Sequence, residues 1–442
     1  MPEPVTETLL SAWRSTLARN PAAPAVIEHA TSRIWTRAEL DEAAQAFATR
    51  LPAAANRRRV TFALPNSGEW FAAFLGLLHA GATPVPLDPA EPRARQLELA
   101  IAARAAFAWI NGETCPAAPR PVSPRGAAPV LVKLTSGSSG TPRALPFNDA
   151  QMLADGRQVC SSMGIRPEDL NLAVIPFGHS YGLGNLVIPL LEQGTAIVCA
   201  DTPLPHALAT LAARHHPTIF PAVPALLRAL AEADLPSDAF ASLRTLISAG
   251  SPLPAVTARA FFDKYGVKIH GFYGSSETGG IAYDRTGDDT MEGRGIGFAM
   301  DGVSISPIRG NRIRVQSTAV SRKGGFIPAD RARIESDGRV VLLGRAGRMI
   351  KIGGRRLDLG DLENTLRRLP GITDAFAAPH PDDPEQLAAV LATELEAGAL
   401  RLLLRRELAP WKIPRRLVPV ATFPLTARGK PDTSALTKLL ER

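Results

Sequence analysis

The feature that most constrains the fold of this chain is a repeated alternation of short apolar runs with helical stretches. Residues 59–64 form an apolar run, residues 70–78 place apolar side chains at helical spacing, and residues 83–87 are extended again. A strand, a helix and a second strand in this order are typical of a parallel sheet with helices on its faces. Further β-rich runs follow at residues 130–134, 172–176, 195–200, 218–220 and 243–248. The sequence therefore predicts an α/β fold class, in which a large N-terminal domain holds mostly parallel sheets flanked by helices.

The texture of the sequence changes after residue 312, where short strands and tight turns follow one another. The pairs Asp337-Gly338 and Gly353-Gly354 indicate turns, and residues 359–369 have the spacing of a helix. We expect a small α+β C-terminal domain in this part of the chain. The predicted domains are residues 1–345 and residues 346–442, and 442 residues are enough for each to have its own core.

The charge balance narrows the classes of ligand. Lys and Arg number 50 against 42 for Asp and Glu, and the formal net charge of +8 favours acidic ligands such as nucleic acid, phosphorylated small molecules or an acidic protein. The basic residues form short sets and no nucleic-acid-binding motif is present, which argues against a nucleic-acid partner. Three cysteines without a CxxC pair argue against a structural zinc site. Residues 1–30 lack an apolar signal core and residues 172–200 are interrupted by prolines and polar residues, so we expect a cytoplasmic protein without membrane insertion.

The segment 131–146, LVKLTSGSSGTPRALP, carries the strongest chemical signal. An apolar run is followed by small and hydroxyl-bearing residues and then by a cation, namely Thr135, Ser136, Gly137, Ser138, Ser139, Gly140, Thr141 and Arg143. Small residues let backbone N–H groups close around phosphate oxygens, and the hydroxyls and the cation add donors and charge. The pattern is not the standard P-loop, because the Gly429-Lys430 pair is followed by Pro431. A flexible linker has a similar composition, but a buried strand directly before the loop favours a phosphate site.

Together with five other segments, this loop resembles the motifs of the adenylate-forming superfamily, which includes acyl-CoA synthetases, the adenylation domains of peptide synthetases and luciferases. The loop is similar to the family's phosphate loop. The other five are similar to its upstream motif, adenine-side loop, Tyr-Gly-x-Thr-Glu motif, hinge motif and terminal lysine motif; they read LLHAGATPVPLDP at 77–89, SAGSPL at 248–253, YGSSE at 273–277, GRAGRMIKIGG at 344–354 and PLTARGKPD at 424–432. The chain thus resembles a compact acyl-CoA synthetase or AMP-dependent acid–thiol ligase.

This resemblance implies an enzyme that converts a carboxylic acid, either an aryl or a fatty acid, to an acyl-adenylate with release of pyrophosphate. The acyl group then passes to the phosphopantetheine thiol of CoA or of an acyl carrier protein. The implied cofactors are ATP and Mg²⁺, with CoA or a holo-acyl carrier protein as the thiol acceptor. In the family the N-terminal domain binds ATP and the acid, and the mobile C-terminal domain carries the catalytic lysine, here Lys430.

The resemblance also assigns site residues. Positive charge and fixed donors stabilise a crowded phosphoryl centre, and the implied catalytic residues are Lys430, Glu277, His179 and Arg143. Glu277 is the implied metal ligand because Mg²⁺ prefers hard oxygen ligands. The implied ATP-binding residues are those of the loop 135–141 together with Ser248, Ala249, Gly250, Tyr273, Gly274, Ser276, Asp330 and Arg345. The thioester step is assigned to Lys351, Gly353 and Gly354, the hinge to Gly347, and the acid pocket to Phe177, Gly178, Tyr181, Gly271, Gly279 and Gly280.

The chain departs from the family's pattern in several places. Arg143 replaces a lysine, which exchanges a point charge for a planar fork, and Ser276 replaces a threonine. Residues 326–330, FIPAD, keep the aspartate of a Tyr-x-Thr-Gly-Asp pattern but lose its Thr and Gly. Gly347 occupies a hinge position that usually holds a charged residue, and glycine's backbone freedom suits a pivot. The stretch between Glu277 and Asp330 is also shorter than in typical members of the family.

One segment supports a rival interpretation. Residues 178–182, GHSYG, match the G-x-S-x-G nucleophile elbow of α/β-hydrolases, in which Ser180 would be the nucleophile of an esterase. The pattern is short and explains none of the other motifs, so the ligase is favoured. The two interpretations differ in one requirement: an esterase needs Ser180 and no ATP, whereas a ligase releases pyrophosphate only with ATP and its acid.

Overall fold

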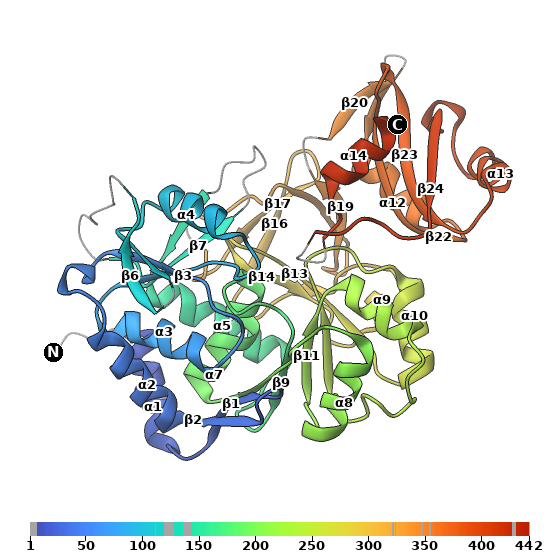
Figure 1. The fold of residues 1–442 in the computed structure, drawn as a ribbon. Coiled ribbons are helices and arrows are strands. Elements are labelled where there is room, and N and C mark those ends of the chain that lie inside the picture. Colours follow the sequence, from blue (N-terminus) through green and yellow to red (C-terminus); the bar gives the residue numbers. More distant parts are fainter. Residues whose placement is uncertain are drawn as a thin grey trace.

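The computed structural model describes residues 7–110, 112–118, 128–135, 143–320, 322, 324–345, 348–352, 355–426 and 430–441. These residues form a large N-terminal body, and the chain beyond residue 348 forms a smaller lobe at one side of it (Figure 1). Within the described ranges, no helix is long and apolar enough to cross a membrane.

The N-terminal body is built on a nine-stranded sheet with the order β15-β14-β13-β12-β11-β9-β10-β1-β2. Its strands are β1 (Pro24–Glu28), β2 (Arg33–Thr36), β9 (Leu170–Ala173), β10 (Ala196–Cys199), β11 (Ile219–Ala222), β12 (Thr245–Ser248), β13 (Ile269–Ser275), β14 (Gly279–Tyr283) and β15 (Phe298–Ala299). The six strands from β13 to β1 pair in parallel, and β2, β14 and β15 add antiparallel edges. The predicted, mostly parallel sheet is confirmed.

Helices cover this sheet and supply two separate apolar cores. One core includes residues from α1 (Leu9–Arg19), α2 (Arg37–Thr49), α3 (Gly68–His79), α5 (Asp149–Met163) and α7 (Ile188–Gln193), and its largest members are Trp13 and Trp70. The other includes residues from α8 (Pro205–His215), α9 (Pro224–Glu232) and α10 (Ala255–Tyr265), around Phe240. Burying a large apolar side chain contributes about 1.5 to 3 kcal/mol. The helices are thus held on the sheet by the apolar spacing noted in the sequence.

A second, smaller sheet has the order β4-β3-β5-β6 and is formed by β3 (Arg59–Phe62), β4 (Thr83–Pro86), β5 (Phe107–Ile110) and β6 (Glu113–Pro116). Its β3 and β4 are parallel and are joined by α3, as predicted. Helix α3 begins after Ser67, whose hydroxyl accepts a hydrogen bond from the N–H of Trp70 at 3.2 Å, and the left-handed Gly81 (φ 67°) follows it. The helix α4 (Arg93–Ala102) lies between β4 and β5 in the chain.

The strand before the phosphate loop differs from the repeated pattern. β7 (Leu131–Thr135) pairs antiparallel with β8 (Arg143–Phe147) in a two-stranded hairpin and does not enter the large parallel sheet. A strand that is followed at once by a short loop and a second strand has its hydrogen-bonding edge filled by its own hairpin partner. The apolar run alone does not distinguish this arrangement from a parallel strand.

The remaining elements connect the body to the lobe and build the lobe itself. Short pieces of the body are η1 (Ala53–Ala55), α6 (Ser180–Gly182), η2 (Leu183–Val187), α11 (Asp288–Glu292), and the hairpins β16 (Ser304–Ile308) with β17 (Arg312–Gln316) and β18 (Asp330–Ile334) with β19 (Val340–Arg345). The lobe contains β20 (Met349–Ile352), β21 (Arg355–Asp358), α12 (Leu359–Arg367), β22 (Ile372–His380), β23 (Asp383–Thr393), α13 (Ala397–Glu407), η3 (Pro410–Lys412), β24 (Arg416–Val420) and α14 (Thr433–Glu441). Two clusters of buried residues lie wholly within it, so the lobe has apolar cores of its own.

Candidate active site

Three of the predicted motifs meet at the carboxyl ends of the parallel strands. The segment 174–182 follows β9, Ser248 ends β12, and Tyr273 lies in β13 next to it. Ligands of open parallel sheets bind in the crevice outside these strand ends. The arrangement therefore brings segments together that are about a hundred residues apart in sequence.

The segment 175–182 is held firmly from both sides. Asn66 clamps its start, because its side-chain N–H₂ donates to the carbonyl of Ile175 and its Oδ1 accepts from the N–H of Phe177, both at 2.8 Å. A Cβ on Gly178 would lie 3.0 Å from Pro86, and one on Gly182 would meet the backbone of residue 176. Two glycines of the GHSYG pattern are therefore required by close packing.

His179 and Ser180 have different partners within this segment. His179 Nε2 lies 3.4 Å from Asp88 Oδ2, whereas the hydroxyl of Ser180 donates to Ser276 Oγ at 3.0 Å. The neighbouring Tyr181 is turned inward and its hydroxyl lies 3.3 Å from the carbonyl of Ala222 at the end of β11. A nucleophile elbow needs a serine paired with a histidine base, and here the serine faces a second serine of the Tyr-Gly-Ser-Ser-Glu segment.

Burial governs the acidity of Tyr181. Its hydroxyl also reaches the carbonyl of Ile247 at 3.2 Å, and its ring packs against Phe272 with the ring centres 5.8 Å apart. Loss of contact with water raises the pKa of the Tyr181 hydroxyl well above its usual value. This side chain is therefore a neutral hydrogen-bond donor to the carbonyls at the ends of β11 and β12.

The turn between β13 and β14 carries Ser276 and Glu277. Both side chains are half-buried, and the turn is closed by a contact of 3.0 Å between the hydroxyls of Ser275 and Thr278. A Cβ on Gly274 would lie 2.7 Å from the carbonyl of Gly279 across the hairpin. The close approach of the two strands explains the glycine and fixes the carboxylate of Glu277 at the strand ends.

Tyr273 links this hairpin to the predicted ribose aspartate. Its hydroxyl donates to Asp330 Oδ2 at 3.0 Å, although the two residues are 57 positions apart. Asp330 begins β18, where its register partner is Arg345 in β19. The backbone of Arg345 is described and its side chain is not. The predicted adenine and ribose residues are thus side by side despite the altered FIPAD segment.

Ser248, Ala249 and Gly250 form the turn after β12. Ser248 Oγ is buried and has no hydrogen-bond partner among the described residues, so it is available to a ligand. Gly250 has a left-handed backbone (φ 95°), and a Cβ at this position would lie 4.0 Å from Cε of Lys430. The predicted catalytic lysine of the C-terminal lobe therefore reaches the predicted adenine-side loop of the N-terminal body.

Backbone contacts hold Lys430 and its neighbour Pro431 against residues 425 and 426. The N–H of Thr426 donates to the carbonyl of Lys430 at 2.8 Å, and Leu425 bridges to Pro431 on either side of it. The side chain of Lys430 is exposed. A long, flexible cation on a backbone held from both sides suits a residue that must reach a ligand from another part of the molecule.

Thr135 and Arg143 mark the two ends of the phosphate loop. They are register partners at the loop end of the β7–β8 hairpin, where Thr135 is half-buried and Arg143 is exposed. The loop residues Ser136, Gly137, Ser138, Ser139, Gly140 and Thr141 lie outside the described part of the chain, as do Gly347, Gly353 and Gly354. Lys351 lies in β20, where only its backbone is described.

The glycines assigned to the acid pocket are packed against side chains. A Cβ on Gly271 would lie 2.7 Å from Thr290 Oγ1, and one on Gly280 would lie 2.5 Å from the sulfur of Met300. Gly279 is left-handed (φ 69°) and a Cβ there would collide with Asp155 Oδ1. These glycines keep β13 and β14 close to the elements behind them.

Two buried charges behind the site escaped the sequence analysis. Lys133 on β7 and Asp155 on α5 are 2% and 3% exposed, and Asp155 Oδ1 accepts a hydrogen bond from the N–H of Gly280 at 3.0 Å. Burial lowers the pKa of Lys133, and the carboxylates of Asp155 and Glu277 oppose this change. Burial likewise raises the pKa of Asp155, against the effect of Lys133 and of the Gly280 N–H. The sequence does contain one sign of this arrangement: Lys133 interrupts the apolar run LVKLT at residues 131–135, which indicates a buried charge.

The residues present suit a magnesium ion that is held mainly by its ligand. Within the described ranges, no group of three or more His, Cys, Asp or Glu side chains is arranged to hold a metal. Mg²⁺ commonly binds through one or two carboxylates together with substrate phosphates, rather than in an all-protein cage. The single half-buried carboxylate of Glu277 fits that mode.

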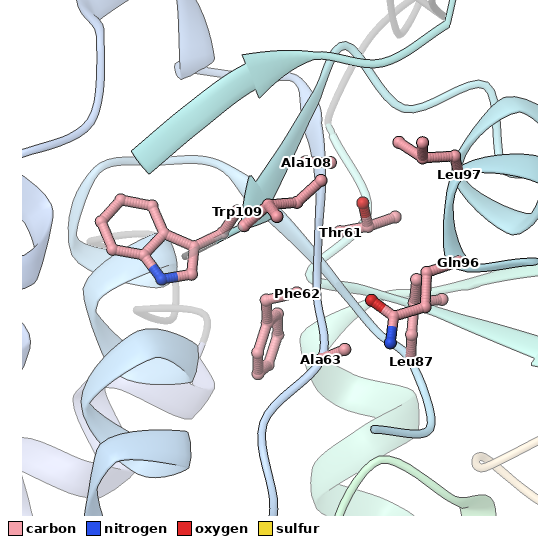
Figure 2. A pocket seen from close by; sticks show the side chains of 9 residues that line it. Thr61, Phe62, Ala63, Leu87, Gln96, Leu97, Ala108 and Trp109 are labelled. Atoms are coloured by element: carbon pink, nitrogen blue, oxygen red, sulfur yellow. The ribbon is translucent and has the colours of Figure 1, made fainter. Parts of the chain in front are cut away.

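A small pocket lies elsewhere, on the second sheet between β3, β5 and α4. Figure 2 shows Thr61, Gln96 and Trp109 among its lining side chains. The Thr61 hydroxyl is buried without a partner among the described residues, whereas Gln96 donates to the carbonyl of Glu91 at 2.8 Å. Apart from Leu87, the lining residues fall outside the motifs, so this pocket is separate from the candidate site.

Comparisons with known proteins agree with this geometry. A family model described as AMP-binding enzyme matches residues 13–115 and 91–315. Similar curated proteins include tyrocidine synthase 3 of Brevibacillus parabrevis (25% identical, covering 91% of this chain and 7% of that protein), sulfoacetate–CoA ligase of Cupriavidus necator (27%, 70% and 66%) and benzoate–CoA ligase of Thauera aromatica (28%, 67% and 63%). The chain spans less than two thirds of the length of these relatives.

Solved structures share the whole fold. The ATP-bound MatB of Rhodopseudomonas palustris superposes with a TM-score of 0.84 at 21% identity, covering 98% of both chains. The AMP complex of MenE, an O-succinylbenzoate Coenzyme A synthetase of Bacillus subtilis, gives a TM-score of 0.81 at 20% identity over 96% of this chain and 97% of that one. The likeness extends through the C-terminal lobe as well as the N-terminal body.

Proposed function

Because the chain belongs to the family of AMP-binding enzymes, we propose that it is an AMP-forming acid–thiol ligase. In the first half-reaction a carboxylic acid attacks the α-phosphate of ATP, giving an acyl-adenylate and pyrophosphate. In the second, the phosphopantetheine thiol of CoA or of an acyl carrier protein takes the acyl group and AMP leaves. The proposed activity thus requires a nucleotide site, an acid site and access for a thiol.

The observation that carries this proposal is the position of Lys430 beside Gly250, where a Cβ added to the glycine would lie 4.0 Å from Cε of the lysine. A carboxylate and a triphosphate repel each other, and a cation between them offsets that repulsion as the new bond forms. On the other side of the nucleotide, Tyr273 and Asp330 would hold adenine and ribose, since a buried ring and a carboxylate suit those groups. Ser248, with its available hydroxyl, would donate to the same nucleotide.

The remaining charges would serve the phosphates. Arg143 stands at the end of the loop 135–141, where it would pair with phosphate oxygens, and Ser276 would donate its hydroxyl to them. Glu277 would hold Mg²⁺. When bound, the ion would supply positive charge that offsets the negative charge of the phosphates.

The second half-reaction would use a different orientation of the two proposed domains, residues 1–345 and 346–442. A rotation about Gly347 would withdraw Lys430 and bring residues 351–354 to the thiol, because one surface cannot hold both the lysine and the thiol path. The lobe also carries Lys412, Arg415 and Arg416, of which Arg415 is exposed. These cations would suit the phosphates of CoA or the acidic surface of a carrier protein.

An aryl acid is the substrate class we favour, with a fatty acid as the alternative. The similar benzoate–CoA ligase takes an aryl acid by its name. In this chain the pocket would be bounded by Tyr181, whose ring packs on Phe272, whereas Phe177 is fully buried against Trp70 and Phe71 and supports the pocket from behind. A pocket walled by aromatic rings favours a flat apolar substrate.

The direct test is a pyrophosphate-release screen over aryl, short-chain and long-chain acids, each with CoA or a holo-acyl carrier protein. We expect release that depends on both ATP and one class of acid, followed by a thioester on one acceptor. Hydrolysis of an ester without ATP, lost in Ser180→Ala, would support the esterase instead and overturn the proposal. The contact of Ser180 with Ser276 in place of a histidine favours the ligase.

A further inference from the structure

A carboxylate and an imidazole from distant segments meet beside the acid pocket. Asp88 follows β4 and His179 precedes α6, and their atoms Oδ2 and Nε2 are 3.4 Å apart. The Asp88 side chain is 8% exposed and that of His179 is 24% exposed. The pair is therefore largely shielded from water, and a charge on Asp88 acts on the imidazole with little screening.

Both partners are fixed by their backbones. The N–H of Leu87 donates to the carbonyl of Phe62 and the N–H of Ala90 donates to Asp88 Oδ1 at 3.0 Å, so that Oδ2 is directed to the histidine. The N–H of His179 donates to the carbonyl of Pro176 at 3.1 Å, and the carbonyl of His179 accepts from the N–H of Leu183 at 2.7 Å. The backbones from which the two side chains extend are therefore held in place, and Asp88 Oδ1 is held by the N–H of Ala90 as well.

The loop of the histidine also rests on the strand of the aspartate. A Cβ on Gly178 would lie 3.0 Å from Cβ of Pro86, two residues before Asp88. The two segments are thus packed against each other with no room for a side chain between them. This contact fixes how close the two backbones lie and so keeps the carboxylate within reach of the imidazole.

The carboxylate beside Nε2 favours one tautomer of the imidazole. His179 Nε2 is buried, and among the described residues no group meets full hydrogen-bond geometry with it, so the Asp88 carboxylate is the polar partner at hand. A carboxylate accepts and does not donate, which favours the tautomer with hydrogen on Nε2. The lone pair is then on Nδ1, the nitrogen on the other side of the ring from the one that meets Asp88.

We propose that Asp88 is a positioning residue that holds His179 with its Nδ1 as the proton acceptor for the attacking thiol. This inference rests on the proposed function and concerns its second half-reaction. The S–H proton passes to Nδ1 while the sulfur forms a bond to the acyl carbonyl carbon. The bond from that carbon to the phosphate oxygen breaks, and AMP leaves with the electron pair. The imidazolium then gives its proton to water.

The first experiment separates the two half-reactions in Asp88→Asn, which keeps the shape of the side chain and removes its charge. We expect acid-dependent ATP–pyrophosphate exchange within about twofold of the parent protein, and single-turnover thioester formation on adding thiol to be about 10- to 100-fold slower, the range typical for loss of a carboxylate behind a histidine. Asp234→Asn, an exposed surface aspartate, is the matched control and should leave both rates unchanged. An equal loss of both rates in Asp88→Asn would overturn the proposal.

A double-variant comparison tests whether Asp88 acts through His179. His179→Gln should slow the thioester step at least as much as Asp88→Asn, and the combined variant should be no slower than His179→Gln alone. Losses that multiply in the combined variant would overturn the positioning role, because they would show that Asp88 acts independently of the histidine.

A third measurement does not depend on the rates. The ¹⁵N chemical shifts of the His179 ring in the parent protein should report hydrogen on Nε2, and in Asp88→Asn they should shift towards a mixture of tautomers. Unchanged shifts would contradict the proposal even in a variant with low activity. Failure of the parent protein to exchange pyrophosphate with any acid would overturn the proposed function and this step with it, whereas normal exchange with a normal thioester rate in Asp88→Asn would overturn this inference alone.

Discussion

Replacing Lys133 with methionine removes a buried cation and keeps the length of the side chain. Lys133 and Asp155 are 2% and 3% exposed, so water cannot compensate the carboxylate that is left behind. Lys133 Nζ lies 4.3 Å from the centre of the Phe147 ring and makes no direct ion pair with Asp155 among the described residues, so the two charges interact through space. Leaving a buried polar group without its compensating partner costs about 1 to 3 kcal/mol. A domain stability of about 5 to 15 kcal/mol makes this a large fraction of the total. We therefore expect Lys133→Met to fold but to unfold at a markedly lower urea concentration.

The second variant is Asp155→Asn, which keeps an oxygen that can accept from the N–H of Gly280. This hydrogen bond, 3.0 Å long, ties α5 to β14, the strand after the Glu277 turn. The single variant leaves Lys133 buried without the charge of Asp155 and should also lose about 1 to 3 kcal/mol. The combined variant has neither charge, so its loss should be smaller than the sum of the two single losses by about 1 to 3 kcal/mol.

The assay is urea unfolding of the parent protein, the two single variants and the double variant, followed by circular dichroism. A matched surface cycle is Lys268→Met with Asp288→Asn, a pair 2.7 Å apart whose side chains are 36% and 37% exposed. Its interaction energy should be at most about 1 kcal/mol. If the losses at Lys133 and Asp155 add within about 0.5 kcal/mol, the two buried charges are energetically independent and the predicted coupling is wrong.

Three further predictions concern other parts of the molecule. Arg228 on α9 of the N-terminal body and Asp374 on β22 of the C-terminal lobe form an ion pair 3.9 Å apart. Arg228→Ala should slow pyrophosphate exchange by up to about fivefold and leave thioester formation from a supplied acyl-adenylate unchanged. A slower thioester step would contradict a role of this contact in the orientation used for adenylation. Burial raises the pKa of the Cys160 thiol to about 12, so this thiol is protonated at pH 8. A disulfide reagent should therefore label Cys115 before Cys160, and the labelling rate of Cys160 should rise about tenfold per pH unit. Equal labelling rates of the two cysteines at pH 8 would refute this. Gly271→Val would press on α11, because even a Cβ added at Gly271 would lie 2.7 Å from Thr290 Oγ1. The variant should lose about 1 to 3 kcal/mol of stability in thermal unfolding. An unchanged unfolding midpoint would show that α11 can move aside.

The sequence predicted those parts of the fold that depend on local pattern. Helix α3 begins and ends near the predicted residues because Ser67 caps its start and Gly81 follows its end. The strands before the motifs were found from their apolar runs. The antiparallel pairing of β7 with β8 was not predicted, because an apolar run shows that a strand is buried but not which strand it pairs with.

The roles assigned to the site residues stay predictions, whereas several contacts between residues far apart in the chain were missed. Tyr273 and Asp330 were assigned to neighbouring tasks from the resemblance, and their hydroxyl and carboxylate are 3.0 Å apart. Asp88, Asn66 and Asp155 act on residues about 90 to 125 positions away, and nothing in the sequence pairs them. Such contacts depend on how whole segments pack.

The proposed ligase depends above all on Lys430 acting in the first half-reaction from the C-terminal lobe. The measurement is acid-dependent ATP–pyrophosphate exchange in Lys430→Ala, with Lys438→Ala, an exposed lysine on α14 of the same lobe, as the matched control. We expect Lys430→Ala to lower the exchange rate by about 10²- to 10³-fold, the usual cost of removing one group that stabilises the transition-state charge, and the control to leave it unchanged. Thioester formation from a supplied acyl-adenylate should stay within a few-fold of the parent rate. Exchange at the parent rate in Lys430→Ala would contradict the role assigned to this lysine and, with it, the proposed function.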